Sequence, residues 1–358
     1  MKKLFAFLLA ALAALSLTVT AFAEEGEASV ALSVTGADGL ELDGSALLRP
    51  GEEYRFPLMI AENGGQARPM TVEDMENYDI KVAAKSGGNI MAEAGRLESG
   101  RQQYLSLTPG NYFGVSSQQV QYTVSLVKKG GSSVLSQCSV SWKVGYPAMD
   151  DDKLGASTQI DPSAPVLTRE QLAAIQKITG AGQASFVGDG WQFSVRLLDQ
   201  SAVNFHSSAA NIQAISNKYP DADFRFMSFG GKPAFDFSGR LTLDVSEMLD
   251  EYGDIYLYRY LDGVLYSLGY QLDEENRTIS IGTKQLGSYA VSNLKIPNGT
   301  VVGGAVPGSS SSGSNSGSSS DADKGNPSTG GADFTGIALA LGFVSLAGAA
   351  AAVKVRKK

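Results

Sequence analysis

The stretch VQYTVSLVKKGGSSVLSQCSVSWKV, residues 120–144, carries the pattern that decides the fold. Apolar and polar residues alternate on both sides of its central KKGGS segment, Lys128–Ser132. Alternation with a period of two puts one set of side chains on a buried face, and a Gly-containing turn between two such runs indicates a β-hairpin. The stretch therefore predicts two paired strands, with Cys138 and Trp142 on the buried face.

The same alternation extends over residues 24–147. Further short apolar runs are separated by Gly, Asn and Pro at the spacing of an antiparallel sandwich, and this predicts an immunoglobulin-like β-sandwich. A short acidic stretch, residues 70–77, predicts one helical turn. The expected additional strands are residues 30–34, 54–60, 78–84, 90–94 and 103–107.

A second β-rich domain with helical insertions is expected over residues 166–297. Thr168 followed by Gln171 is a capping box, which predicts a helix that ends near Gly180. A second short helix is expected over residues 208–217. The expected strands of this domain are residues 191–197, 224–229, 241–245, 255–260, 264–270, 278–281 and 289–292.

Residues 148–165 are expected to be a linker between the two domains. They contain the acidic triplet Asp150–Asp152, together with Gly155, Pro162 and Pro165. A calcium site needs oxygen ligands spaced around a loop, and this pattern is missing, so solvated linker charge is the preferred interpretation.

Composition excludes several classes of protein. The chain has 358 residues, one Cys, one His and a formal net charge of −8. One cysteine cannot form an internal disulfide, and Cys138 is expected to be a small buried residue. An acidic chain gives no support for nucleic-acid binding.

The N-terminus has the pattern of a secretory signal peptide over residues 1–23. Lys2 and Lys3 precede an apolar core, and the A-x-A segment before Glu24 predicts cleavage between Ala23 and Glu24. Near the other end, residues 298–325 are rich in Gly and Ser without an apolar period, which predicts a flexible stalk.

Three segments follow the stalk. The pentapeptide Asn326-Pro327-Ser328-Thr329-Gly330 comes first, then an apolar run over residues 334–353, then a basic C-terminal tail over residues 354–358. An uncharged run of about 20 residues is long enough to span a bilayer as a helix. The basic C-terminal tail is expected on the cytoplasmic side.

Together these segments resemble the cell-wall sorting signal of Gram-positive surface proteins, whose usual pentapeptide is Leu-Pro-x-Thr-Gly. The resemblance implies that a sortase cleaves after Thr329 and joins its carbonyl to peptidoglycan, so the chain is in the membrane only before sorting. Position one is Asn326 rather than Leu. The resemblance places the protein at the cell wall. Residues 254–296 are also similar to a module of surface proteins from Clostridia, which brings no activity with it.

Pilus polymerisation is not expected. Backbone pilins offer a Lys in a Tyr-Pro-Lys motif to the sortase, whereas here Tyr146-Pro147 is followed by Ala148 and Tyr219-Pro220 by Asp221. The resemblance therefore implies single display.

No catalytic, cofactor or metal site is predicted. The single histidine, His206, lacks a recognisable nucleophile motif and is interpreted as a helix-start or surface residue. A zinc site needs more ligands than one His and one Cys provide. Acidic residues are plentiful, so a glycosidase with paired carboxylates stays open as an alternative.

One aromatic row is a candidate ligand surface. Tyr256, Tyr258 and Tyr260 fall on one face of a predicted strand, and exposed aromatic rows bind sugars or proteins. Ordinary packing within the sheet is the competing interpretation. The preferred function is a non-enzymatic adhesion or binding module for a host glycan or protein, or for a wall polymer. A structural spacer or coat protein and a surface hydrolase of glycans are the alternatives.

Overall fold

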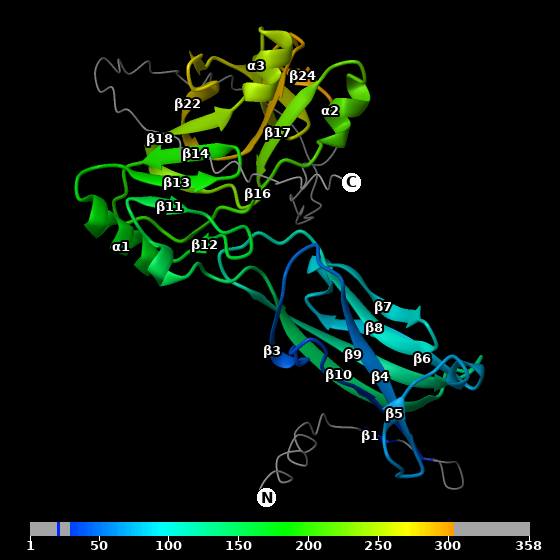
Figure 1. Cartoon of the computed structure of the whole chain (residues 1–358). Coiled ribbons are helices and arrows are strands. Elements are labelled where there is room, and N and C mark those ends of the chain that lie inside the picture. The colour runs from blue at the N-terminus through cyan, green and yellow to red at the C-terminus, as the bar shows by residue number, and fades with distance from the viewer. Residues whose placement is uncertain (1–19, 22–28, 304–358) are drawn as a thin grey trace, which may run out of the picture. The chain divides into compact units, whose positions relative to one another are not determined.

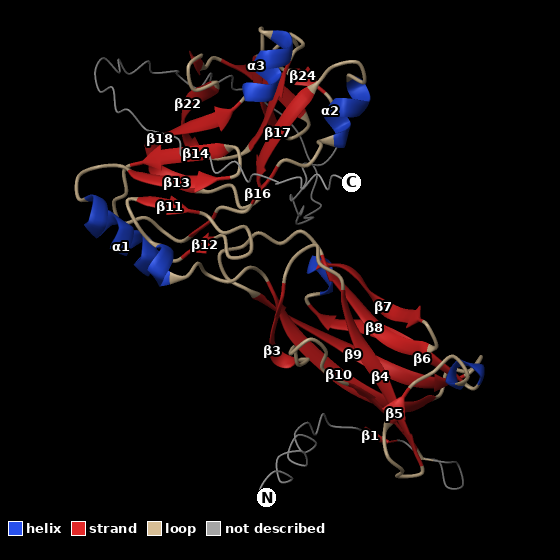
Figure 2. Cartoon of the chain, viewed as in Figure 1, coloured by secondary structure: helices blue, strands red, loops and turns tan. Residues whose placement is uncertain are grey.

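The computed structural model describes residues 20–21 and 29–303, all within one compact unit, Met1–Ser311 (Figure 1). The predictions for the pentapeptide, the membrane span and the basic C-terminal tail lie outside these residues, as do nearly all of the signal peptide and of the stalk. The described chain is mainly β, as predicted, with a few short helices (Figure 2).

The N-terminal part is a sandwich of two sheets. The first sheet has the order β2-β4-β8-β7, with β5 beside β4. The second has the order β1-β10-β9-β6, with β3 running parallel to β10. The strands are β1 (Thr20–Ala21), β2 (Val30–Val34), β3 (Asp43–Leu48), β4 (Tyr54–Glu62), β5 (Arg68–Pro69), β6 (Tyr78–Ser86), β7 (Met91–Ser99), β8 (Gln102–Pro109), β9 (Gln118–Lys128) and β10 (Val134–Val144).

The predicted hairpin is confirmed as β9 and β10. They pair antiparallel, with Cys138 opposite Val124 and Trp142 opposite Val120. The alternating apolar side chains of both strands are buried in the core of this sandwich. Cys138 is 1% exposed, and burial raises the pKa of its thiol to about 11, as expected for a small buried residue.

The predicted helical turn is confirmed as the 3₁₀ helix η1 (Asp74–Glu76). The carboxylate of Asp74 lies above this turn and accepts two N–H groups of Arg68, each at 2.7 Å, and the N–H of Thr71 at 2.8 Å. A second 3₁₀ helix, η2 (Gly88–Ile90), precedes β7.

The C-terminal part contains two six-stranded sheets. One has the order β11-β13-β14-β18-β22-β21, the other β16-β17-β23-β19-β20-β24, and β12 pairs with β15. The strands are β11 (Ser157–Gln159), β12 (Val166–Leu167), β13 (Ala184–Gly188), β14 (Trp191–Val195), β15 (Val203–Asn204), β16 (Ser207–Ser208), β17 (Phe224–Phe229), β18 (Ala234–Asp244), β19 (Tyr256–Leu261), β20 (Val264–Leu268), β21 (Gln271–Asp273), β22 (Thr278–Gln285), β23 (Ser288–Ser292) and β24 (Thr300–Val301). The helices are α1 (Arg169–Thr179), α2 (Gln213–Lys218), α3 (Ser246–Tyr252) and the 3₁₀ helix η3 (Asp151–Lys153).

The predicted capping box of α1 is confirmed. Gln171 N–H donates to Thr168 Oγ1, and the side chain of Gln171 accepts the Thr168 N–H. Leu172 and Ile175 place the apolar face of the helix in the core. The second predicted helix, residues 208–217, is shorter than expected, because Ser207–Ser208 form a strand and α2 begins at Gln213.

Residues 148–165 are not a linker, so this prediction was wrong. Met149 is 3% and Ile160 5% exposed, and both belong to the core between the two six-stranded sheets. β11 lies inside this segment and pairs in parallel with β13. The acidic residues that suggested a linker are on its surface, while its few apolar residues are buried.

The cores divide close to the predicted boundary. One cluster draws all its buried residues from 30–144, and two others draw theirs from 149–296. The first of these two fills the space between the six-stranded sheets, and the second lies under α2. None of the described helices is long and apolar enough to cross a membrane.

Candidate functional site

The predicted aromatic row is not a ligand surface. Tyr256, Tyr258 and Tyr260 do share one face of β19, but that face packs beneath α2, against Ile212 and Ile215. Tyr258 is 1% and Tyr260 2% exposed, and Tyr256 is half-buried against the same core. Sheet packing, the competing interpretation, is therefore correct for this row.

The hydroxyl groups of Tyr258 and Tyr260 are hydrogen-bonded within the protein. Tyr258 donates to the carbonyl of Leu294 at 3.1 Å and accepts the N–H of Ile296 at 2.6 Å. Tyr260 donates to the carbonyl of Gly303 at 2.9 Å. These bonds tie the chain after β23 to the sheet and leave little for a ligand.

His206 is neither at a helix start nor on the open surface. It lies between β15 and β16 and is half-buried, and its Nδ1 has no hydrogen-bond partner. Burial lowers the pKa of its imidazole. Among the residues that the structure describes, no nucleophile is hydrogen-bonded to its Nδ1.

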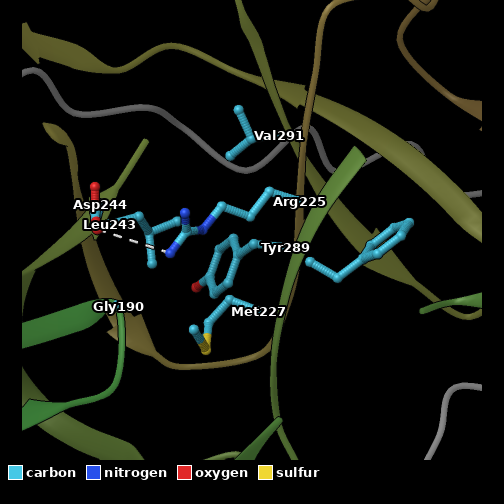
Figure 3. Close-up of a pocket in the computed structure, with 8 residues that line it drawn as sticks. Gly190, Arg225, Met227, Leu243, Asp244, Tyr289 and Val291 are labelled. Carbon is cyan, nitrogen blue, oxygen red and sulfur yellow. Dashed lines mark ion pairs between the residues drawn. The ribbon is translucent and has the colours of Figure 1, made fainter. Parts of the chain in front are cut away.

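A small cavity opens between the two six-stranded sheets beside Arg225 (Figure 3). The guanidinium of Arg225 points to Asp244, 3.8 Å away, and also lies 3.6 Å from Glu247. The ring of Tyr289 and the side chain of Met227 lie next to it (Figure 3). The free space is about 10 Å³, which is no more than one water molecule occupies. This cavity is too small for an organic ligand.

The hollows described in residues 29–303 can be compared with the cleft of a glycosidase. The residues that the structure describes contain no group of three or more His, Cys, Asp or Glu that could hold a metal ion. Neither the Arg225 cavity nor an open hollow between α2 and Gly303 is lined by a pair of carboxylates. A glycosidase needs such a pair at its cleft.

The most extensive candidate is a flat surface on the sheet that runs from β11 to β21. Figure 1 shows β11, β13, β14 and β18 side by side. Phe186, Phe193 and Leu241 lie opposite one another on β13, β14 and β18 and are buried in the core. Their neighbours along each strand therefore point outward. We call this surface the outer face. Its residues are Ser157, Gln159, Ser185, Val187, Gln192, Ser194, Arg240, Thr242, Gln271, Ser280 and Gly282.

Cross-strand register brings these residues into rows. Gln192 on β14 lies opposite Thr242 on β18, and Thr242 lies opposite Ser280 on β22. In the next row Ser185 lies opposite Ser194. Every outer-face residue named above is exposed or partly exposed, so no described element covers the sheet at these positions.

The outer face is lined almost entirely by hydroxyl and amide groups. Among the residues named above only Arg240 is charged, and two carboxylates, Asp244 and Asp273, follow on the same side at the far end of the face, where both lie opposite Thr278. Gln192 Nε2 donates to Ser185 Oγ at 2.6 Å, which fixes the side chain along the sheet. A neutral hydrogen bond contributes only about 0.5–1.5 kcal/mol, so such a surface suits an extended ligand that makes many contacts.

Comparison with known proteins gives no family. No family model matches the chain, and no curated protein matches it. Among solved structures, a chimeric titin Z1Z2 carrying a decorin peptide is 10% identical, with a TM-score of 0.18, and the match covers 32% of this chain and 90% of that one.

Two bacterial structures match over more of the chain. The C-terminal domain of the AgI/II polypeptide BspA from Streptococcus agalactiae is 8% identical, with a TM-score of 0.18, over 74% of this chain and 89% of that one. A Bacteroides ovatus protein, SGBP-B of a mixed-linkage glucan utilization locus, in complex with a heptasaccharide, is 11% identical, with a TM-score of 0.16, over 71% of this chain and 74% of that one. Scores this low do not place the chain in any of these groups.

Proposed function

We propose that the chain is a non-catalytic binding module, displayed on the cell wall of a Gram-positive bacterium, that holds an extended polymer on the outer face. The observation that carries the proposal is the outer face itself. It is a broad surface of hydroxyl and amide groups that no described element covers. Groups of this kind make hydrogen bonds to the hydroxyls of a polysaccharide or to an extended peptide.

Display on the wall is supported by the sequence. The signal peptide, the stalk and the segment from Asn326 to the basic C-terminal tail are arranged as in sortase substrates. The N-terminal sandwich is consistent with a role in display, because the order of its strands follows that of immunoglobulin domains. β2-β4-β8-β7 corresponds to the four-stranded sheet and β6-β9-β10 to the three-stranded one.

A spacer without a ligand is the second candidate. It is favoured by the burial of Tyr258 and Tyr260, which removes the aromatic surface that the sequence suggested. A hydrolase is not favoured, because no pair of carboxylates lines the hollows described above.

Anchoring and binding are tested separately. Mass spectrometry of wall digests is expected to find Thr329 linked to peptidoglycan, and intact Lys358 in the mature surface form would contradict anchoring. Cells that display the full chain are then compared with isogenic cells without it on an array of glycans, wall polymers and matrix proteins. Retention of at least one polymer by the displaying cells alone supports the binding module. Equal behaviour on the whole array would leave the spacer.

A further inference from the structure

Three cations gather at one end of the outer face. Arg196 follows β14, Arg240 is on β18 and Lys284 is on β22, and all three are exposed. None takes part in an ion pair among the described residues. We call these residues the basic end. Most other described arginines have a carboxylate partner, namely Arg49, Arg55, Arg68, Arg96, Arg101, Arg169, Arg225 and Arg277.

The absence of a carboxylate partner sets Arg196 and Arg240 apart from most described arginines of this chain. Acidic residues outnumber basic ones, 37 to 29, so an exposed arginine is expected to find a carboxylate. The carboxylates on this side of the sheet, Asp244 and Asp273, lie at its far end, and Asp236, at the irregular start of β18, has no ion pair with any of the three. Three like charges without partners repel one another, and a bound anion relieves that repulsion.

Register places the three cations close together. Arg240 lies opposite Gly282 on β22, and Lys284 follows Gly282 by two residues on the same side of the sheet. Arg240 also lies opposite Ser194, and Arg196 follows Ser194 by two residues. Neighbouring strands are about 5 Å apart and residues two apart on a strand about 7 Å, so the cations occupy adjacent positions.

Gly282 leaves a shallow opening between them. A Cβ added there would meet a single atom within 4 Å, Ser238 Oγ at 3.6 Å. The opening is bordered by Arg240, Lys284 and Ser238. On the other side the guanidinium of Arg196 lies 5.5 Å from the centre of the Phe237 ring, which holds it against the sheet.

We propose that the basic end recognises the carboxylate or sulfate groups of an acidic polysaccharide. The chain of sugars then continues over the hydroxyl and amide rows of the outer face. Arg240 presents a planar guanidinium that donates two parallel N–H groups to one carboxylate or sulfate. Lys284 and Arg196 take neighbouring acidic groups, and Ser238 and Ser280 are positioned for sugar hydroxyls. This assignment rests on the proposed binding function and specifies its ligand class.

The surface suits a polysaccharide better than single-stranded nucleic acid. Nucleic-acid grooves combine cations with exposed aromatic rings on which bases stack. The outer face has no aromatic residue, and Phe237, the ring nearest the basic end, is half-buried beneath Arg196. Its hydroxyl and amide rows match sugar hydroxyls instead.

The test uses the purified full chain in mild detergent, immobilised on a sensor. The probes are dextran, dextran sulfate, hyaluronan and single-stranded DNA. The variant is Arg240→Gln with Lys284→Gln, and the matched control is Arg169→Gln with Lys177→Gln, which removes the same charge from α1. We expect the wild-type chain to bind dextran sulfate and hyaluronan, and the variant to lose at least tenfold in affinity for both. The control is expected to change less than twofold.

Three results would overturn the proposal. Equal losses in variant and control would mean a general charge effect, and tighter binding of DNA than of both acidic polysaccharides would mean a different ligand class. Binding of dextran that equals binding of dextran sulfate, unaffected by the variant, would sink the acidic-ligand assignment while leaving the binding function in place. If no probe or array polymer is retained, the binding function itself fails.

Discussion

Arg240 on β18 lies directly opposite Gly282 on β22, so a guanidinium faces a position without a side chain. This pairing opens the outer face beside one of its few charges. Three neighbouring strands contribute to the same spot, since Ser194 on β14 is the partner of Arg240 on the other side. In the proposed function, this is the end of the surface at which an acidic polymer is recognised.

Filling this opening is predicted to block binding without unfolding the sheet. Gly282→Val places a branched side chain beside Arg240, and the backbone at Gly282 needs no positive φ. We expect at least a tenfold loss of affinity for dextran sulfate. Gly95→Val is the control, because Gly95 lies on β7 of the N-terminal sandwich and a Cβ there meets nothing within 4 Å. Affinity that survives Gly282→Val would show that the opening is not used.

The ion pair above η1 is predicted to be a main stabilising contact of the N-terminal sandwich. Asp74 is 7% exposed and accepts bonds from Arg68 and Thr71. Asp74→Asn leaves buried donors without a charged acceptor, so we expect a loss of about 1.5–3 kcal/mol in the free energy of unfolding. Asp79→Asn, which removes an exposed partner of Lys129, is the control and should cost less. Denaturant titration measures both.

This pair also predicts an acid dependence. The hydrogen bonds from Arg68 hold the pKa of Asp74 below its ordinary value of 3.8. The contribution is therefore present above pH 3.8 and is lost as the pH falls through the lower, folded-state pKa. The wild-type chain should lose this stability in acid, and Asp74→Asn should show a smaller loss over the same range.

Gln171 is predicted to hold the segment around Met149 and Asp151 against the start of α1. Its Nε2 donates to the carbonyl of Met149 at 2.6 Å and to Asp151 Oδ1 at 2.7 Å. Gln171→Ala removes these bonds and the capping bond to Thr168, so we expect a loss of about 1–3 kcal/mol. Gln213→Ala on the exposed start of α2 is the control. Proteolysis within residues 148–165 should increase only in the Gln171 variant.

His206 is predicted to make folding sensitive to mild acid. Burial lowers the pKa of His206 below 6.5, so the folded state disfavours the protonated ring. The unfolded chain then binds the proton more readily, and stability falls as the pH drops below about 6.5. His206→Gln removes the titrating group. Thermal melts on both sides of that pH should show a smaller decrease for the variant than for the wild type, and equal decreases would contradict the assignment.

Much of the architecture could be predicted from local patterns. The hairpin of residues 120–144 and the capping box of Thr168 and Gln171 are encoded within a few residues, and both are confirmed. β3 was missed because DGSALL has no clear alternation, and α3 was missed because its seven residues contain few apolar ones. Met149 and Ile160 were hidden among acidic and turn residues, so their segment looked like a linker.

The candidate site could not be predicted, because it depends on contacts between distant segments. Alternation showed that Tyr258 and Tyr260 share a face, but not that Ile215 of α2 and Ile212 just before it pack against that face. The outer face needs the register of β14, β18 and β22, strands that begin at residues 191, 234 and 278. No local pattern in the sequence states that Gln192, Thr242 and Ser280 form one row.

The central claim is that the outer face is the surface that holds a polymer, and photo-crosslinking tests it most directly. Benzoylphenylalanine is introduced in place of Thr242, at the centre of the outer face, in the full chain displayed on cells. The control has it in place of Thr123, an equally half-buried outward residue on β9 of the N-terminal sandwich. With a fluorescent acidic polysaccharide, irradiation should label the protein at position 242 at least tenfold more than at position 123. Equal labelling at the two positions, or none at 242 while the polymer stays bound, would contradict the account.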